Sequence, residues 1–160
     1  MEVNAMDDQD IIRQHLLDLL GRGQAHPEFE QVVRGFPHET INRRPPNLPY
    51  SPWRLLEHIR IAQWDILEFI RNPDHVSPHW PEGYWPAENE RADEPRWAMT
   101  IAGIQADRQA LAAIVADPET DLLTDLRHAA GYTILREILV VCDHNAYHLG
   151  ELGLLREAMK

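Results

Sequence analysis

The stretch SPWRLLEHIRIAQWDILEFIRNP, residues 51–73, carries the most complete helical signature in the chain. Ser51 is a suitable N-cap, and Pro52 suits the first helical position because its missing N–H would be unpaired there anyway. Asn72 precedes Pro73, which biases the backbone away from helical dihedrals and ends the pattern. The apolar positions recur at helical spacing, and one imidazole shares their stripe: Leu55, His58, Ile59, Ala62, Ile66 and Phe69.

Three further stretches show the same periodicity. A first helix is expected from about Asp7 to Leu20, with its stripe at Ile11, Ile12, Leu16, Leu19 and Leu20. A short helix with Pro27 in its first turn is expected next, with Phe29, Val32, Val33 and Phe36 apolar. A third main helix, capped by Asp93, runs to Asp117 and Pro118, and the last follows Thr133 from Ile134 to Ala158.

Four main helices predict an all-α fold, a four-helix bundle forming a single domain over residues 1–160. No βαβ alternation or Gly-rich phosphate loop is present, which disfavours nucleotide-binding folds. Residues 119–132 stay ambiguous: Leu122, Leu123 and Leu126 need burial, while Gly131 indicates a turn.

A long Pro-rich and aromatic connector separates the second and third main helices. Residues 73–95 lack any period and contain Trp80, Tyr84 and Trp85 among prolines. Long irregular segments inside compact domains are uncommon and are often functional. Two interpretations stay open: a loop anchored by its aromatic rings over one end of the bundle, or a loop that shapes a pocket.

The composition excludes several function classes. Asp and Glu number 26 against 15 Lys and Arg, so the net charge is 15 − 26 = −11, which disfavours nucleic acid and anionic membrane surfaces as partners. The longest purely apolar run, residues 138–142, is too short to span a membrane, and the acidic N-terminus lacks the apolar core of a secretory signal. The lone Cys142 fits a reducing cytoplasm.

Nine histidines beside one cysteine mean that any bound metal is expected to be held by imidazole and carboxylate. The last helix reads VVCDHNAYHLGELGLLREAM over residues 140–159, which places His144 and His148 four positions apart. On a helix this puts them on one face, about 40° apart around the axis and roughly 6 Å apart along it. HExxH peptidases use the same spacing, but Asn145 stands where their general-base Glu would be.

A third ligand is expected from a facing helix, and His58 is the best candidate. Taken alone, His58 is better explained as a structural side chain bonded to a backbone carbonyl or a carboxylate, and the spacing of His144 and His148 is by itself a weak signal. Together they predict a three-histidine site with an open coordination position, as in catalytic metal sites. Nitrogen ligands suit zinc, nickel or iron, and spacing does not choose among them.

Two carboxylates are candidates for supporting roles. Glu151 follows His148 by three residues and could accept its ring N–H, bind metal directly or act as a base. Asp65 follows His58 by seven residues and is a similar candidate. Asp143 and Cys142 are expected to face away from the pair, and His128 could approach the bundle mouth.

These segments resemble a known family. The stretches PPNLPYSPWRLLEHIRIAQWDILEFIRNP, SPHWPEGYWP and TILREILVVCDHNAYHLGELGLLRE together are similar to the DinB-like (YfiT-like) metalloenzyme superfamily, in its DinB_2-type branch. The resemblance covers nearly the whole chain. It implies an up-down-down-up bundle, a divalent metal held by His58, His144 and His148, and a homodimer.

The resemblance also implies a range of activities. Some relatives are transferases or isomerases in which the metal activates a low-molecular-weight thiol such as bacillithiol, mycothiol or glutathione. Relatives often have Gln at the position of Glu151, and the extra carboxylate here would favour activation of water over an anionic thiol. DNA-damage induction of a founding member does not imply nucleic acid binding.

Three hypotheses follow. The first is a metal-dependent thiol transferase or hydrolase acting on a small molecule, with Trp53, Trp80 and Trp85 lining an apolar substrate pocket. The second is a stress-response module whose metal is structural or sensory. The third is a metal-free bundle that works through protein contacts.

Overall fold

The computed structural model describes residues 7–159. Its main helices are α1 (Asp8–Gly21), α3 (Pro52–Arg71), α4 (Glu94–Ala116) and α5 (Ile134–Ala158). Shorter elements connect them: α2 (Phe29–Val33), the 3₁₀ turns His38–Thr40 and Glu82–Tyr84, and strands β1 (Asp125–Leu126) and β2 (Ala129–Thr133). The fold is therefore all-α apart from one small hairpin, as predicted.

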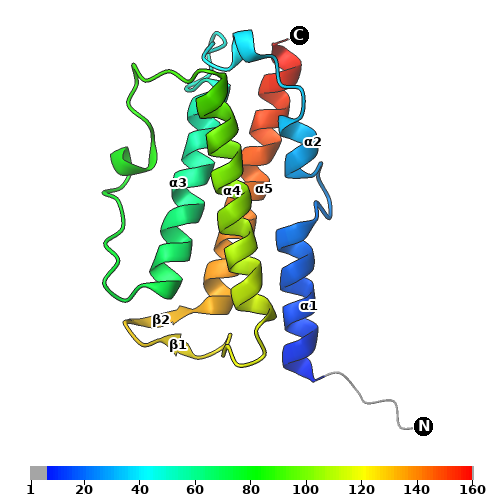
Figure 1. Cartoon of the computed structure of the whole chain (residues 1–160), viewed down its shortest axis with the longest axis vertical. Coiled ribbons are helices and arrows are strands. Elements are labelled where there is room, and N and C mark those ends of the chain that lie inside the picture. The colour runs from blue at the N-terminus through cyan, green and yellow to red at the C-terminus, as the bar shows by residue number, and fades with distance from the viewer. Residues whose placement is uncertain (1–6, 160) are drawn as a thin grey trace, which may run out of the picture.

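The four main helices form an up-down-down-up bundle (Figure 1). α1 and α5 run in one direction, and the consecutive helices α3 and α4 both run in the other. Because α3 and α4 are parallel, the chain between them has to return along the whole bundle. The connector does so along the outer side of α3, which confirms the expected topology.

Side-chain caps set where the main helices begin. Asp7, Ser51, Asp93 and Thr133 each accept a hydrogen bond from a backbone N–H two or three residues later. These bonds satisfy amide groups that have no partner inside the helix. The caps predicted at Ser51, Asp93 and Thr133 are confirmed. The short helix differs from its prediction, since α2 begins at Phe29 and Pro27 lies outside it.

The core consists of two apolar clusters, one toward each end of the bundle. One surrounds Trp53, Leu56 and Leu152, and the other surrounds Leu67, Leu111 and Val141. The predicted stripe on α3 is too narrow, because α3 packs against both α4 and α5 and also buries Leu56, Gln63, Leu67 and Ile70.

The predicted stripe on α1 is partly wrong. Ile11 and Leu19 are 41% and 42% exposed, whereas Arg13 is only 7% exposed. The Arg13 guanidinium donates to the carbonyl oxygens of Val115, Pro118 and Thr120, where α4 ends and the chain turns away. A cation at a helix C-terminus also interacts favourably with the helix dipole.

The ambiguous segment contains the two-stranded antiparallel hairpin of β1 and β2. Leu122 is fully buried and Leu126 is half-buried, but Leu123 is 47% exposed, which corrects the expectation that all three are buried. Gly131 has a φ of 84°, the left-handed region that suits glycine, and its N–H bonds to Asp125. Within residues 7–159, no helix is long and apolar enough to cross a membrane.

Arg13→Met keeps the apolar stem of this side chain but leaves three carbonyl groups without their charged donor. We expect the free energy of unfolding to fall by about 2–3 kcal/mol, measured by urea denaturation. Arg127→Met is the matched control, because Arg127 is exposed on the hairpin, and its effect should stay within about 0.5 kcal/mol. Equal losses in the two variants would contradict the buried role of Arg13.

Candidate metal centre

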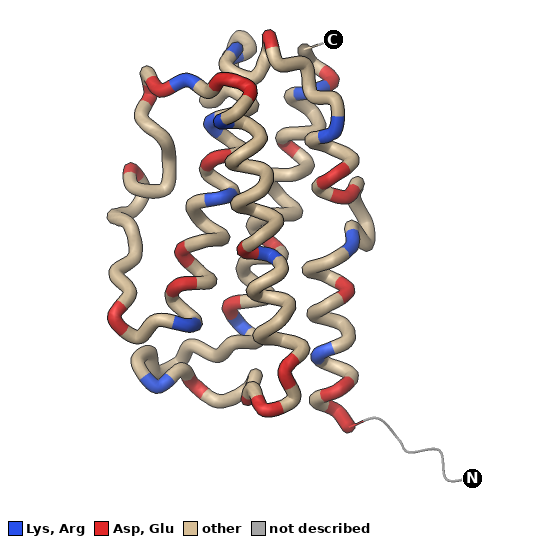
Figure 2. Tube along the Cα trace, viewed as in Figure 1, with Lys and Arg blue, Asp and Glu red and all other residues tan. Residues whose placement is uncertain are grey.

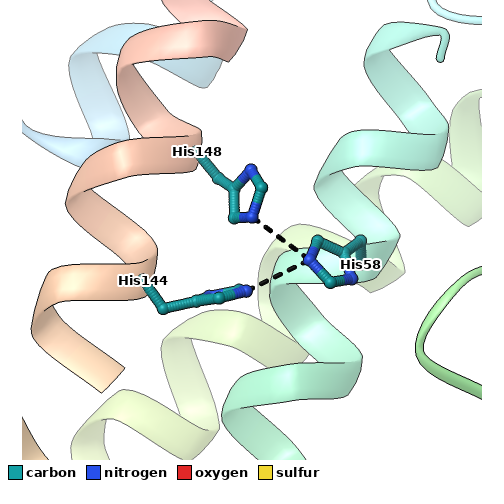
Figure 3. A group of neighbouring side chains, drawn as sticks. All are labelled: His58, His144 and His148. Carbon is teal, nitrogen blue, oxygen red and sulfur yellow. Dashed lines mark hydrogen bonds between the residues drawn. The ribbon is translucent and has the colours of Figure 1, made fainter. Parts of the chain in front are cut away.

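Three imidazoles from two helices meet inside the bundle (Figure 3). His58 projects from α3, and His144 and His148 project toward it from successive turns of α5. The Nε2 atom of His58 lies 3.1 Å from that of His144 and 3.2 Å from that of His148. The structure therefore brings together the three histidines that the sequence singled out.

Two residues of the connector orient the imidazole of His58. Its Nδ1 lies 2.8 Å from the backbone oxygen of Tyr84, which can only accept, so Nδ1 carries the ring hydrogen and Nε2 has a free lone pair. The indole of Trp85 stacks on the same imidazole with a centroid distance of 3.9 Å and an interplanar angle of 3°. His58 is consequently fixed both in tautomer and in orientation.

A chain of amides fixes His144. The carbonyl oxygen of Ile104 accepts from Nε2 of Gln63 at 2.7 Å, so the Oε1 atom of Gln63 is left to accept from Nδ2 of Asn145, at 2.8 Å. Oδ1 of Asn145 then faces Nδ1 of His144 at 3.2 Å, and His144 must be the donor. Asn145 cannot act as a general base. Its amide oxygen instead keeps the ring hydrogen of His144 on Nδ1, which leaves the lone pair on Nε2.

Glu151 plays the equivalent part for His148. Its Oε2 atom lies 2.7 Å from Nδ1 of His148, which corresponds to the first of the three roles considered for this carboxylate. The hydroxyl groups of Tyr50 and Tyr147 also bond to Glu151. Burial and this hydrogen bond raise the pKa of Tyr50, and the Glu151 charge raises the pKa of the exposed Tyr147.

These tautomers direct three nitrogen lone pairs toward one another, which is unfavourable unless a cation lies between them. Burial lowers the pKa of His58 to about 4 and also lowers that of His144. A proton on one of these rings is therefore unfavourable as the positive charge between them. Tetrahedral Zn–N bonds of about 2.0–2.1 Å place ligand nitrogens roughly 3.3 Å apart. The two separations measured from Nε2 of His58, 3.1 and 3.2 Å, are close to this value, and all three ligand nitrogens lie within 4.8 Å of one another.

Asp65 lies away from this centre, where it ties the connector to α3. It accepts from Nε2 of His75 at 2.7 Å and from the hydroxyl of Tyr84 at 2.5 Å. Burial and the bond to Asp65 raise the pKa of Tyr84 to about 12. The sequence suggested that Asp65 supports a histidine directly, but it contacts none of the three. Because the backbone of Tyr84 bonds to His58, Asp65 supports the centre indirectly, through Tyr84.

The tryptophans expected to line a pocket are placed differently from one another. Trp85 covers His58 and stacks on Tyr50 at a centroid distance of 5.3 Å. Trp53 is fully buried in the core, with the Arg96 guanidinium 5.3 Å from its ring centroid. Trp80 is 68% exposed on the outside of the connector, against Tyr84.

The other candidates lie outside the centre. His128 bonds to the Phe69 carbonyl oxygen beside the hairpin and does not approach the bundle mouth. Asp143 is exposed, as expected. Cys142 packs with the apolar core, and burial raises the pKa of its thiol to about 11, so it is a neutral apolar group.

Sequence reasoning missed the residues that hold the imidazoles from a distance. Gln63, Tyr84 and Tyr50 all contact the centre or its supports. Gln63 is fully buried, and a polar residue amid an apolar helical pattern is the one signal that could have found it. The contacts of Tyr50 and Tyr84 depend on loop paths that no periodicity predicts.

The sequence profile of the DinB superfamily matches residues 23–152, which include all three histidines. No curated protein and no solved structure matches the chain significantly.

Gln63→Leu removes the amide that orients Asn145 while keeping a side chain of similar size. We expect zinc affinity to fall about 10- to 100-fold, since loss of a group that orients a ligand histidine has effects of that size. Competition with a chromophoric chelator measures it. Gln105→Leu, a half-exposed position on α4, is the control and should bind zinc like the wild type. Unchanged affinity in Gln63→Leu would contradict the amide chain.

The pKa of His58 predicts a pH dependence of the metal-free protein. Its value of about 4 in the fold lies below the ordinary 6.5, so between these values the unfolded chain binds more protons than the folded one. Stability should therefore decrease as the pH falls from 6.5 toward 4. Thermal melts should show a steeper fall of Tm for the wild type than for His58→Gln, and identical slopes would refute this assignment.

Proposed function

Since the chain belongs to the DinB superfamily and its three imidazoles converge on one point, we propose that it is a divalent-metal-dependent enzyme acting on a small molecule. The reaction is a thiol-dependent transfer or a hydrolysis, and the metal is zinc, nickel or iron. The observation that carries the proposal is the set of three Nε2 lone pairs left unprotonated by their Nδ1 partners.

The number of ligands supports catalysis over a structural metal. Among residues 7–159, the group that could hold an ion contains three histidines, and the nearby carboxylate of Glu151 is turned to Nδ1 of His148. Three protein ligands leave a coordination position for a substrate or water. When bound there, a metal lowers the pKa of a thiol or water and so supplies a nucleophile at neutral pH.

The chain's own residues prepare this position. Glu151 keeps the hydrogen of His148 on Nδ1, and the indole of Trp85 covers one face of His58 and excludes water from it. Tyr147 is 65% exposed and its hydroxyl reaches Glu151, which provides a path for a proton between solvent and that carboxylate.

A stress-response module with a structural or sensory metal is the second candidate, and a fourth protein ligand on the metal would favour a structural role. A homodimer and a cytoplasmic location stay predictions that rest on the family resemblance and on cysteine usage. The exposed apolar residues along α5 (Leu139, Val140, Tyr147 and Leu154) are the surface on which a dimer would be sought first.

Elemental analysis of protein purified without a histidine tag tests the proposal. We expect about one equivalent of divalent metal in the wild type and less than a tenth of that in His58→Ala and His148→Ala. His128→Ala is the control, because its exposed imidazole lies by the hairpin, and it should retain the metal. Substoichiometric metal in the wild type, unchanged by both substitutions, would refute the site.

A thiol-transfer assay with a chromogenic electrophile then separates the two candidates. Metal-dependent turnover with at least one cellular thiol, or metal-dependent hydrolysis, would support the enzyme. A loaded site without either activity would favour the structural or sensory role.

A further inference from the structure

Three arginines line one polar pocket at the end of the bundle where α3 begins. The cavity is about 220 Å³ in volume, and six residues line it: Asn42, Arg44, Ser51, Arg54, Glu88 and Arg91. It lies between the segment that enters α3 and the last part of the connector. Figure 2 shows several of the chain's few basic positions at this end, next to acidic ones.

None of the three guanidinium groups forms an ion pair with a carboxylate of the described residues, although acidic residues outnumber basic ones in the chain. Within residues 7–159, ion pairs with Glu instead engage another set of arginines: Arg60, Arg71, Arg96, Arg108 and Arg136. In the pocket, Arg54 and Arg91 donate to backbone carbonyl oxygens, and no described residue pairs with Arg44. Glu88 forms no ion pair with them, so the local charge is 3 − 1 = +2.

Arg54 is half-buried, and its Nη2 donates to the carbonyl oxygen of Pro86. Its Nε atom is buried and has no hydrogen-bond partner among the described residues, so only the outer part of the guanidinium group faces the pocket. The nearby backbone amides do not compete for a ligand, because those of Trp53 and Arg54 already bond to Ile41 and Ser51. The N-terminus of α3 adds only its favourable field for an anion.

The pocket is a neighbour of the three-histidine centre. Arg54 precedes His58 by one turn of α3, about 6 Å along the helix axis. Its Nη2 donates to the carbonyl oxygen of Pro86, and Pro86 follows Trp85, whose indole stacks on His58. The arginine pocket therefore lies about one helical turn from the centre along α3.

We propose that the Arg44–Arg54–Arg91 pocket binds the carboxylate of the small molecule that reacts at the three-histidine centre. The inference rests on the proposed function and narrows its substrate to acidic molecules; if the substrate is a thiol, it is a carboxylate-bearing one such as glutathione, not a neutral sugar thiol. Guanidinium groups suit this role, because their paired N–H donors match the two oxygens of a carboxylate.

The first test uses succinate and metal-free protein, with succinamide as the neutral comparison. We expect saturable binding of succinate by calorimetry, no binding of succinamide, and at least a tenfold loss of succinate affinity in the double variant Arg44→Gln/Arg91→Gln. The control Arg34→Gln/Arg127→Gln changes the net charge equally at exposed positions outside the pocket and should bind succinate like the wild type. Equal succinate binding by the two double variants, or none by the wild type, would overturn the proposal.

The second test uses zinc-loaded protein with glutathione and its dimethyl ester. The wild type should bind the acid at least tenfold more tightly than the ester, and Arg44→Gln/Arg91→Gln should lose this preference while keeping its zinc. Equal affinity of the wild type for both thiols would overturn the proposal for a thiol substrate. Binding of neither thiol, with succinate binding intact, would instead count against the thiol chemistry and leave the carboxylate pocket standing.

Discussion

Three imidazoles, one buried and two half-buried, each donate their Nδ1 hydrogen to an acceptor outside the cluster, and this leaves three lone pairs facing one another. The acceptors come from different parts of the chain: the backbone of Tyr84, the amide of Asn145 and the carboxylate of Glu151. Burial lowers the pKa of His58 and of His144 and so opposes their protonation. The surrounding structure thus maintains a site whose electrostatics are completed by a cation.

The direction of the helices explains how the connector comes to take part. α3 is 20 residues long, about 30 Å, and α4 runs parallel to it, so the chain has to cover that length again before α4 begins. The connector that covers this length lies along α3, where its residues Tyr84 and Trp85 contact His58. Asp65, with bonds to His75 and Tyr84, keeps the segment in place.

Charge is distributed differently from what the net value of −11 suggests. The three-histidine centre is built from neutral rings, and the one carboxylate beside it bonds to three N–H and O–H donors. One helical turn away, three guanidinium groups share a pocket with a single carboxylate, that of Glu88, and none of them forms an ion pair with a described residue. The net charge of the chain therefore does not describe the local charge at this end of the bundle.

The sequence by itself determined the main helices and the shared face of His144 and His148, because capping residues such as Ser51 and a four-residue spacing act within one helix. It did not determine the hairpin at residues 125–133 or the exposure of Ile11, because both depend on which neighbour each segment meets. Only the tertiary structure decided the tautomers of the imidazoles. Their acceptors lie on other turns, helices and loops, and a hydrogen bond between distant residues leaves no period in the sequence.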